Sequence, residues 1–114
     1  MDYNSDFRYD LKLGQETENE LGKILKDKTI EVKDDSAKSS KTGNVFIEYE
    51  SRNKLSGIST TLSDYYAIKT SDGTFILIET NKLKDIARKH YKNKINGGDN
   101  NTSKGILIPR CDLL

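Results

Sequence analysis

The sequence predicts one α/β domain in which a mixed sheet is flanked by helices. Two segments, 14–26 and 81–92, repeat apolar residues at helical spacing. Short segments between and after them alternate apolar with polar residues, as strands do. The resulting order of helix, four strands, helix and strand indicates a mixed sheet rather than a helical bundle or an all-β fold.

The N-terminal part divides into an arm and a helix. Residues 1–12 are polar and aromatic without a clear period, so we expect an arm that precedes the domain at 13–114. The helix over 14–26 has an apolar stripe that includes Leu21 and Leu25. Glu18 lies on the same stripe, and we therefore expect its carboxylate to point toward the buried side.

Alternation and turn residues place the remaining elements. The predicted strands cover 29–35, 44–50, 65–70, 74–80 and 105–112. Ser71-Asp72-Gly73 is a strong hairpin signal between the third and fourth strands. Asn81 is a good N-cap for the helix over 81–92. The connections at 36–42, 51–63 and 93–104 read as a mobile turn and two loops.

Composition limits the classes of function. The chain has 114 residues, a net charge of +1 and one cysteine, Cys111, so no internal disulfide can form. No apolar run approaches the ~20 residues that span a bilayer, and no secretory signal pattern is visible, so we expect a cytoplasmic protein without a membrane partner. His90 is the single histidine, which argues against a zinc site. Gly97-Gly98 lacks the Lys-Ser or Lys-Thr of a nucleotide-binding P-loop.

Acidic side chains gather on the first two predicted strands. In an alternating strand Glu31, Lys33 and Asp35 share one face, and Glu48 and Glu50 share a face of the next strand. Carboxylates that converge from adjacent strands repel one another unless a hard cation lies between them. We therefore expect Mg²⁺ at this point, with Mn²⁺ as a possible substitute.

Asp35 and Glu48 are the expected ligands of this metal, with help from Glu18, and Lys33 would offset developing negative charge. Asp34 is the rival of Asp35. The alternative is an exposed sheet face with Lys–Glu pairs across strands.

Two basic segments are candidates for phosphate contacts. The loop after the second strand carries hydroxyls and cations that suit a DNA backbone, namely Arg52, Lys54, Ser56, Ser59 and Thr60. On the helix over 81–92, Lys84 and Arg88 are spaced to lie along one face. The alternatives are a solvated loop with capped turns and a solvated lysine face.

The motif Gly-x-x-x-Glu-x-Glu-Leu at Gly14–Leu21, followed by a strand ending in Asp and a strand carrying Glu, resembles the PD-(D/E)XK nuclease superfamily. The helix is similar to that of archaeal-type Holliday junction resolvases, and the stretch from Glu31 to Asp64 resembles small phage-encoded nucleases of this type. The resemblance implies a restriction-endonuclease-like αβββαβ core and a catalytic role for Glu18. The chain departs from the family pattern after Glu48, where Glu50 replaces the usual lysine or Lys33 supplies it from the neighbouring strand.

The resemblance implies a metal-dependent endodeoxyribonuclease that resolves four-way DNA junctions. Two symmetric cuts require two active sites, so a homodimer is expected, acting in the host cytoplasm if the protein is phage-encoded. The alternatives are a phage restriction, repair or packaging nuclease, and a non-catalytic nucleic-acid-binding domain of the same fold.

Overall fold

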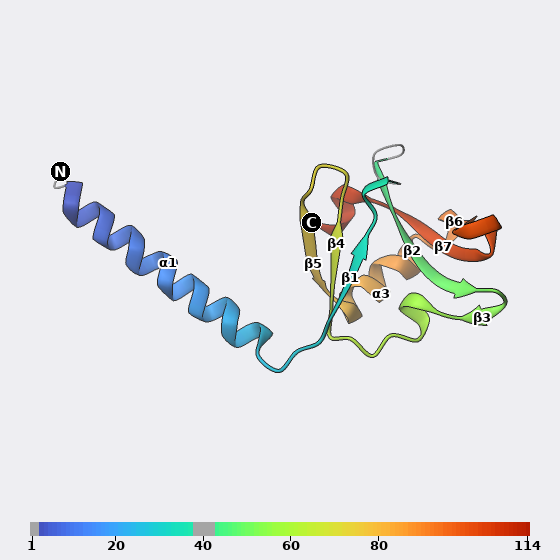
Figure 1. The fold of residues 1–114 in the computed structure, drawn as a ribbon, viewed down its shortest axis with the longest axis horizontal. Coiled ribbons are helices and arrows are strands. Elements are labelled where there is room, and N and C mark those ends of the chain that lie inside the picture. The colour runs from blue at the N-terminus through green and yellow to red at the C-terminus, as the bar shows by residue number, and fades with distance from the viewer. Residues whose placement is uncertain (1–2, 38–42) are drawn as a thin grey trace.

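The computed structural model describes residues 3–37 and 43–114 and shows a mixed α/β body with a long N-terminal helix. The helix α1 (Tyr3–Leu25) projects from the body (Figure 1). The predicted arm at 1–12 is therefore wrong from Tyr3 onward, because these residues continue the helix. Residues 38–42, within the predicted turn, lie outside the described part of the chain.

The strands form two sheets rather than the one central sheet that we expected. The first sheet has the order β1-β4-β5, built from β1 (Ile30–Asp34), β4 (Tyr65–Lys69) and β5 (Phe75–Glu79). In it, β1 runs parallel to β4, and β4 runs antiparallel to β5. The predicted Asp72-Gly73 hairpin is confirmed: the Thr74 N–H donates to Asp72 Oδ1 (3.0 Å), and Gly73 has a φ of +81°.

The second sheet is antiparallel and has the order β3-β2-β7-β6. Its strands are β2 (Asn44–Ser51), β3 (Lys54–Leu55), β6 (Lys94–Gly97) and β7 (Ser103–Pro109). The predicted loop at 93–104 is thus wrong in part, because β6 and the start of β7 lie within it. The loop predicted at 51–63 likewise contains a tight hairpin, in which Arg52 and Asn53 both have positive φ.

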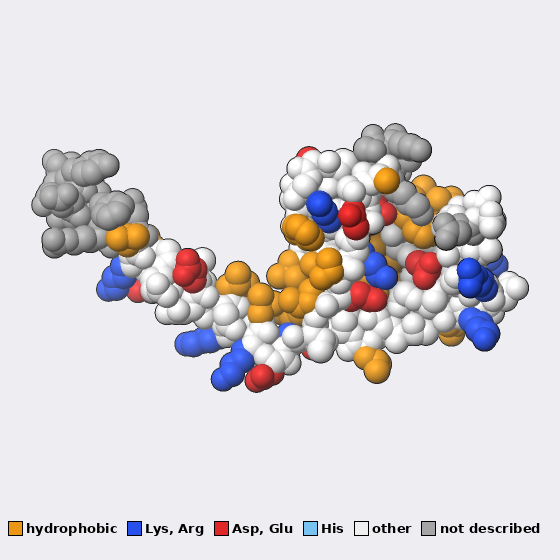
Figure 2. Space-filling view, viewed as in Figure 1, with side chains coloured by type: hydrophobic (Ala, Val, Ile, Leu, Met, Phe, Trp, Pro, Cys, Tyr) orange, Lys and Arg blue, Asp and Glu red, His pale blue; other side chains and the backbone are white. Residues whose placement is uncertain are grey.

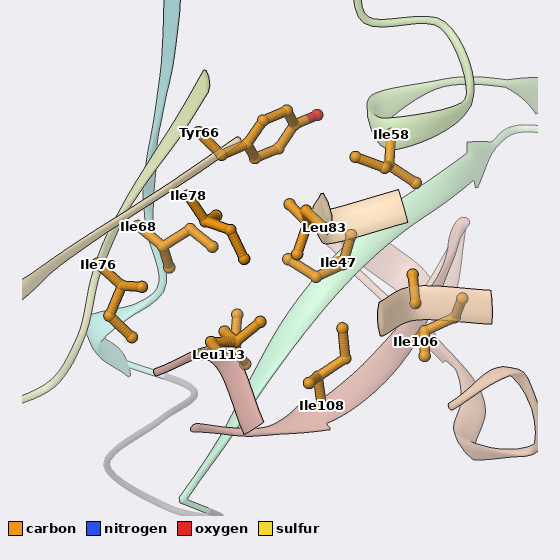
Figure 3. Close-up of a cluster of buried hydrophobic side chains, with 12 residues drawn as sticks. Ile47, Ile58, Tyr66, Ile68, Ile76, Ile78, Leu83, Ile106, Ile108 and Leu113 are labelled. Atoms are coloured by element: carbon orange, nitrogen blue, oxygen red, sulfur yellow. The ribbon is translucent and has the colours of Figure 1, made fainter. Parts of the chain in front are cut away.

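The hydrophobic core fills the space between the two sheets and the helix α3 (Thr80–Lys89) (Figure 3). Alternate residues of β4 and β5 point inward, including Tyr66, Ile68 and Ile76, and meet Ile47 and Ile108 from the second sheet. α3 begins one residue before Asn81, with Glu79 as its N-cap, and ends at Lys89 rather than at 92.

The helix α1 does not contribute to this core. Leu21 and Ile24, which we expected to be buried, are each about half exposed, and Glu18 is exposed with them. The prediction that Glu18 faces the buried side is therefore wrong, because α1 leaves the body instead of packing on it (Figure 1). No helix among the described residues is long and apolar enough to cross a membrane.

Candidate functional site

A cavity of about 340 Å³ lies where the two sheets meet, and the predicted catalytic residues Lys33, Asp35 and Glu48 line it together. Asp34 and Tyr66 also line this cavity. Figure 2 shows acidic and basic side chains next to one another on the face between β1 and β2. The acidic strands β1 and β2 are not paired, which corrects the expectation of adjacent strands in one sheet.

Backbone hydrogen bonds join the two sheets at Asp35. Its N–H donates to the Lys69 carbonyl on β4 (2.9 Å), and its Oδ2 accepts from the Phe46 N–H on β2 (3.2 Å). Asp35 is buried, so these contacts fix the carboxylate at the cavity wall. Asp34, the rival candidate, is exposed, and its Oδ1 accepts from both the N–H and the hydroxyl of Ser36. These hydrogen bonds, the one from the Ser36 hydroxyl above all, lower the pKa of Asp34.

Glu48 is held by the turn that follows the short β2–β3 hairpin. The Ser56 hydroxyl donates to Glu48 Oε2 at 3.0 Å. Gly57, with a φ of +52°, lies so close that an added Cβ would overlap the Glu48 carbonyl. A side chain other than glycine would therefore push this turn away from the strand.

Glu31 and Lys33 form an ion pair along β1, with 3.5 Å between Lys33 Nζ and Glu31 Oε1. Their contact confirms that the two side chains share a face. Burial by itself raises the pKa of Glu31, but the hydroxyls of Tyr66 and Thr61 and the ammonium of Lys33 outweigh it, so the pKa is below its ordinary value. Glu31 is therefore ionised at neutral pH.

Tyr66 was not among the predicted site residues, although it is 2% exposed and lines the cavity. Burial and the charge of Glu31 raise its pKa, so the phenol stays protonated. Its hydroxyl acts on Glu31 electrostatically, but neither this hydroxyl nor Glu31 Oε2 makes a hydrogen bond of good geometry within the described part of the chain. In Figure 3 the hydroxyl is at the end of the ring that points away from Ile68 and Ile78.

Glu50 does not belong to the cavity. Between Glu48 and Glu50 the pairing with β7 shifts, so that Glu48 lies opposite Gly105 and Glu50 opposite Lys104. Gly105 and Lys104 are neighbours on β7 and therefore face opposite sides of the sheet. Their partners Glu48 and Glu50 face opposite sides for the same reason. Glu50 instead pairs with Lys104 (3.2 Å) in a separate hollow. The expectation that Glu48 and Glu50 share a face is wrong for this reason, and Glu18 does not line the cavity either.

The predicted DNA-contacting residues fall into two groups. Arg52 and Lys54 are exposed at the β2–β3 hairpin, whereas the loop hydroxyls bond to the chain itself. Besides Ser56, Ser59 donates to the Tyr49 carbonyl (2.8 Å) and Thr60 to that of Gly57 (3.5 Å).

On α3, Lys84 and Arg88 border another hollow beside Tyr91, and Arg88 also pairs with Asp85 (2.7 Å). The structure thus does not bring this helical pair to the cavity wall.

Carboxylate oxygens line the cavity, and such oxygens are the ligands that hard cations prefer. In the described ranges, no three His, Cys, Asp or Glu side chains come together as a metal-binding group. Mg²⁺ needs only one or two protein carboxylates, because it keeps several waters. Asp35 and Glu48 are two carboxylates that line this cavity, and neither Glu31 Oε2 nor the Tyr66 hydroxyl makes a hydrogen bond of good geometry within the described residues.

We predict that Gly57→Ala destabilises the protein more than Gly73→Ala. Both glycines have positive φ, so both substitutions cost roughly 1–2 kcal/mol. Only at Gly57 does the new Cβ meet the backbone of Glu48; at Gly73 it meets nothing within 4 Å. Overlap of this kind adds about 1–3 kcal/mol, which chemical denaturation would measure. Equal losses for both variants would contradict the close contact.

Comparisons of the chain with protein-family models, with curated proteins and with solved structures found no match. Function is therefore argued from the geometry of the cavity and from the motifs in the sequence.

Proposed function

We propose that the protein is a metal-dependent endonuclease that hydrolyses phosphodiester bonds in DNA. The observation that carries this proposal is the convergence of Lys33, Asp35 and Glu48 on one cavity from two different sheets. Carboxylates beside an ammonium group are the side chains that metal-assisted phosphodiester hydrolysis requires. The strand residues that carry the resemblance, Asp35 and Glu48, support the same superfamily because they line this cavity. The motif around Glu18 lies on α1 outside the cavity and the sheet is divided in two, and both are departures from a restriction-endonuclease-like core.

Asp35 and Glu48 would hold Mg²⁺ or Mn²⁺, and the bound cation supplies an activated water and neutralises phosphate charge. Lys33 faces the same space and offsets negative charge on the phosphate oxygens. Glu31 positions the Lys33 ammonium through their ion pair. The Tyr66 phenol, which stays protonated at neutral pH, would donate a hydrogen bond to an oxygen in the cavity.

In the net reaction, water adds across the bond between phosphorus and the bridging oxygen. The hydroxyl joins the phosphorus, and the remaining proton ends on the leaving oxygen. The products are a phosphate monoester and a free hydroxyl end.

The substrate that we propose is branched DNA, with a four-way junction as the specific case. Arg52, in the turn that follows the strand of Glu48, and Lys54, on the paired strand β3, carry cations that suit phosphates next to the cleaved bond. The sequence carries no recognisable base-reading motif, so we propose that the protein reads the shape and backbone of the DNA. A junction needs two cuts, and the proposal therefore includes a homodimer.

We predict that Glu48→Gln and Asp35→Asn each lower cleavage by about a hundredfold or more while the fold is kept. The assay compares labelled four-way junction, linear duplex and single strand, in Mg²⁺ and in a chelator. Glu50→Gln is the matched control, and it should cut at the wild-type rate because Glu50 lies outside the cavity. If wild-type protein binds DNA but never cuts it, the non-catalytic binding domain is correct. If Glu50→Gln alone loses activity, the site is wrongly assigned.

We predict that Tyr66→Phe separates activity from stability. Removing a buried hydroxyl without a good partner should leave the free energy of unfolding unchanged or raise it by up to about 1 kcal/mol. Cleavage should fall about tenfold to a hundredfold, as for other donors in an active site. Tyr65→Phe, on the other face of β4, is the control and should cut normally. A loss of stability with full activity would show that the Tyr66 hydroxyl has only a structural role.

A further inference from the structure

The helix α1 has an apolar face that nothing in the described structure covers. Leu11, Leu13, Leu21 and Ile24 are 44–59% exposed. At about 100° per residue, Leu13, Leu21 and Ile24 lie on one side of the helix, and Leu11 lies at the edge of that side next to Glu18. The opposite side is polar, with Lys12, Asn19 and Lys23. A helix that is amphipathic in this way normally packs its apolar face against a partner.

The three-stranded sheet has an uncovered apolar face of its own. Ile30 and Val32 of β1 and Phe75 and Leu77 of β5 are 42–64% exposed. In the sheet register Val32, Ala67 and Leu77 lie level with one another, so the exposed side chains form one continuous patch. Figure 2 shows hydrophobic side chains gathered over this sheet and at the neighbouring end of α1.

The turn between α1 and β1 directs the helix away from its own sheet (Figure 1). The Lys28 N–H donates to the Leu25 carbonyl (3.1 Å), and Asp27 has a φ of +59°. On the other side of the turn, the Thr29 N–H donates to Asp64 Oδ2 (2.9 Å), and the Asp64 N–H donates back to the Thr29 hydroxyl (3.1 Å). These hydrogen bonds tie Lys28 to the end of α1 and Thr29 to Asp64.

We propose that α1 of one copy packs its apolar face onto the outer face of the β1-β4-β5 sheet of a second copy, and that the second copy does the same in return. Contact between two helices would leave both sheet patches exposed, and contact between two sheets would leave both helices exposed. A mutual exchange covers all four surfaces with two copies and closes by two-fold symmetry.

The dimensions of the two surfaces agree with this exchange. The segment from Leu11 to Leu25 is about 21 Å long at 1.5 Å per residue. The five-residue strands β1 and β5 extend about 16 Å. One helix can therefore cover the whole length of the sheet patch.

The exchange leaves the candidate catalytic cavity open. Ile30 and Val32 alternate along β1 with Glu31 and Lys33, which face the cavity side. The docked helix thus lies on the opposite side of the sheet from the proposed DNA site. The inference does not depend on nuclease activity, because it concerns assembly alone.

Analytical ultracentrifugation of the whole protein tests the exchange. Wild type should sediment as a dimer at micromolar concentration, and Leu21→Asp or Val32→Asp should raise the dimer dissociation constant at least tenfold. Asn19→Asp, on the polar side of α1, is the matched control and should remain a dimer. A 1:1 mixture of the Leu21→Asp and Val32→Asp proteins should dimerise more strongly than either alone, because one intact helix and one intact sheet patch then meet.

Cysteine capture tests the same contact without a charge on the apolar surfaces. In a background with the exposed Cys111 changed to serine, a Leu21→Cys protein mixed with a Val32→Cys protein should form a disulfide-linked pair. An Asn19→Cys protein in place of the first should not. A monomeric wild type, dimers that survive both aspartate substitutions, or a disulfide formed only within one chain carrying both cysteines would overturn the proposal.

Discussion

The candidate site depends on a single irregularity, the β-bulge that β2 makes against β7 after Glu48. Before the bulge, Val45 and Ile47 alternate into the core and Phe46 and Glu48 point to the cavity side. The bulge inserts Tyr49 as an extra residue, so the next acid turns to the other face and meets Lys104. In a regular strand that kept Tyr49 in the alternation, Glu48 and Glu50 would share one face. Bulges often re-aim side chains next to active sites.

The second constraint is the meeting of the two sheets at Asp35. A buried carboxylate is costly unless hydrogen bonds compensate it, and here the Phe46 N–H on β2 donates to the Asp35 carboxylate. The backbone N–H of Asp35 donates in turn to the Lys69 carbonyl on β4. The same contacts hold the end of β1 against the start of β2. The polar groups around Asp35 thus lie at the cavity between the two sheets, next to the hydrophobic core. The buried Tyr66 hydroxyl makes no hydrogen bond of good geometry within the described residues, and it therefore lowers the free energy of unfolding.

The sequence was sufficient for the elements whose residues alternate clearly. The strands β1, β2, β4 and β5 were predicted within two residues of their observed ends, because each alternates and a clear turn joins the last two. The β2–β3 hairpin was missed because Arg52 and Asn53 adopt positive φ without a glycine. The edge strand β6 was missed because it is short and mostly polar.

Pairing between distant strands and contacts between elements could not be read from local pattern. The chain forms two sheets because β1 pairs in parallel with β4 and not with β2. This pairing depends on residues that are far apart in the chain. For the site, Lys33, Asp35 and Glu48 line one cavity, and their roles in metal binding and catalysis stay predictions. Glu50 was predicted wrongly because the bulge turns it to the other face of β2. Glu18 was predicted wrongly because α1 leaves the body (Figure 1). The sequence did hold one signal for Tyr66. It alternates with Ile68 on the inward face of its strand, and a tyrosine in such a position places a hydroxyl at the edge of the core.

The most direct measurement of the central claim is an NMR titration with Mn²⁺, whose unpaired electrons broaden the signals of nearby amides. If Asp35 and Glu48 hold the catalytic cation, substoichiometric Mn²⁺ should broaden the amides of Asp35, Phe46 and Glu48 first, and excess Mg²⁺ should restore them. Broadening confined to the exposed acids of α1, or spread evenly over the surface, would contradict a metal-dependent nuclease centred on this cavity.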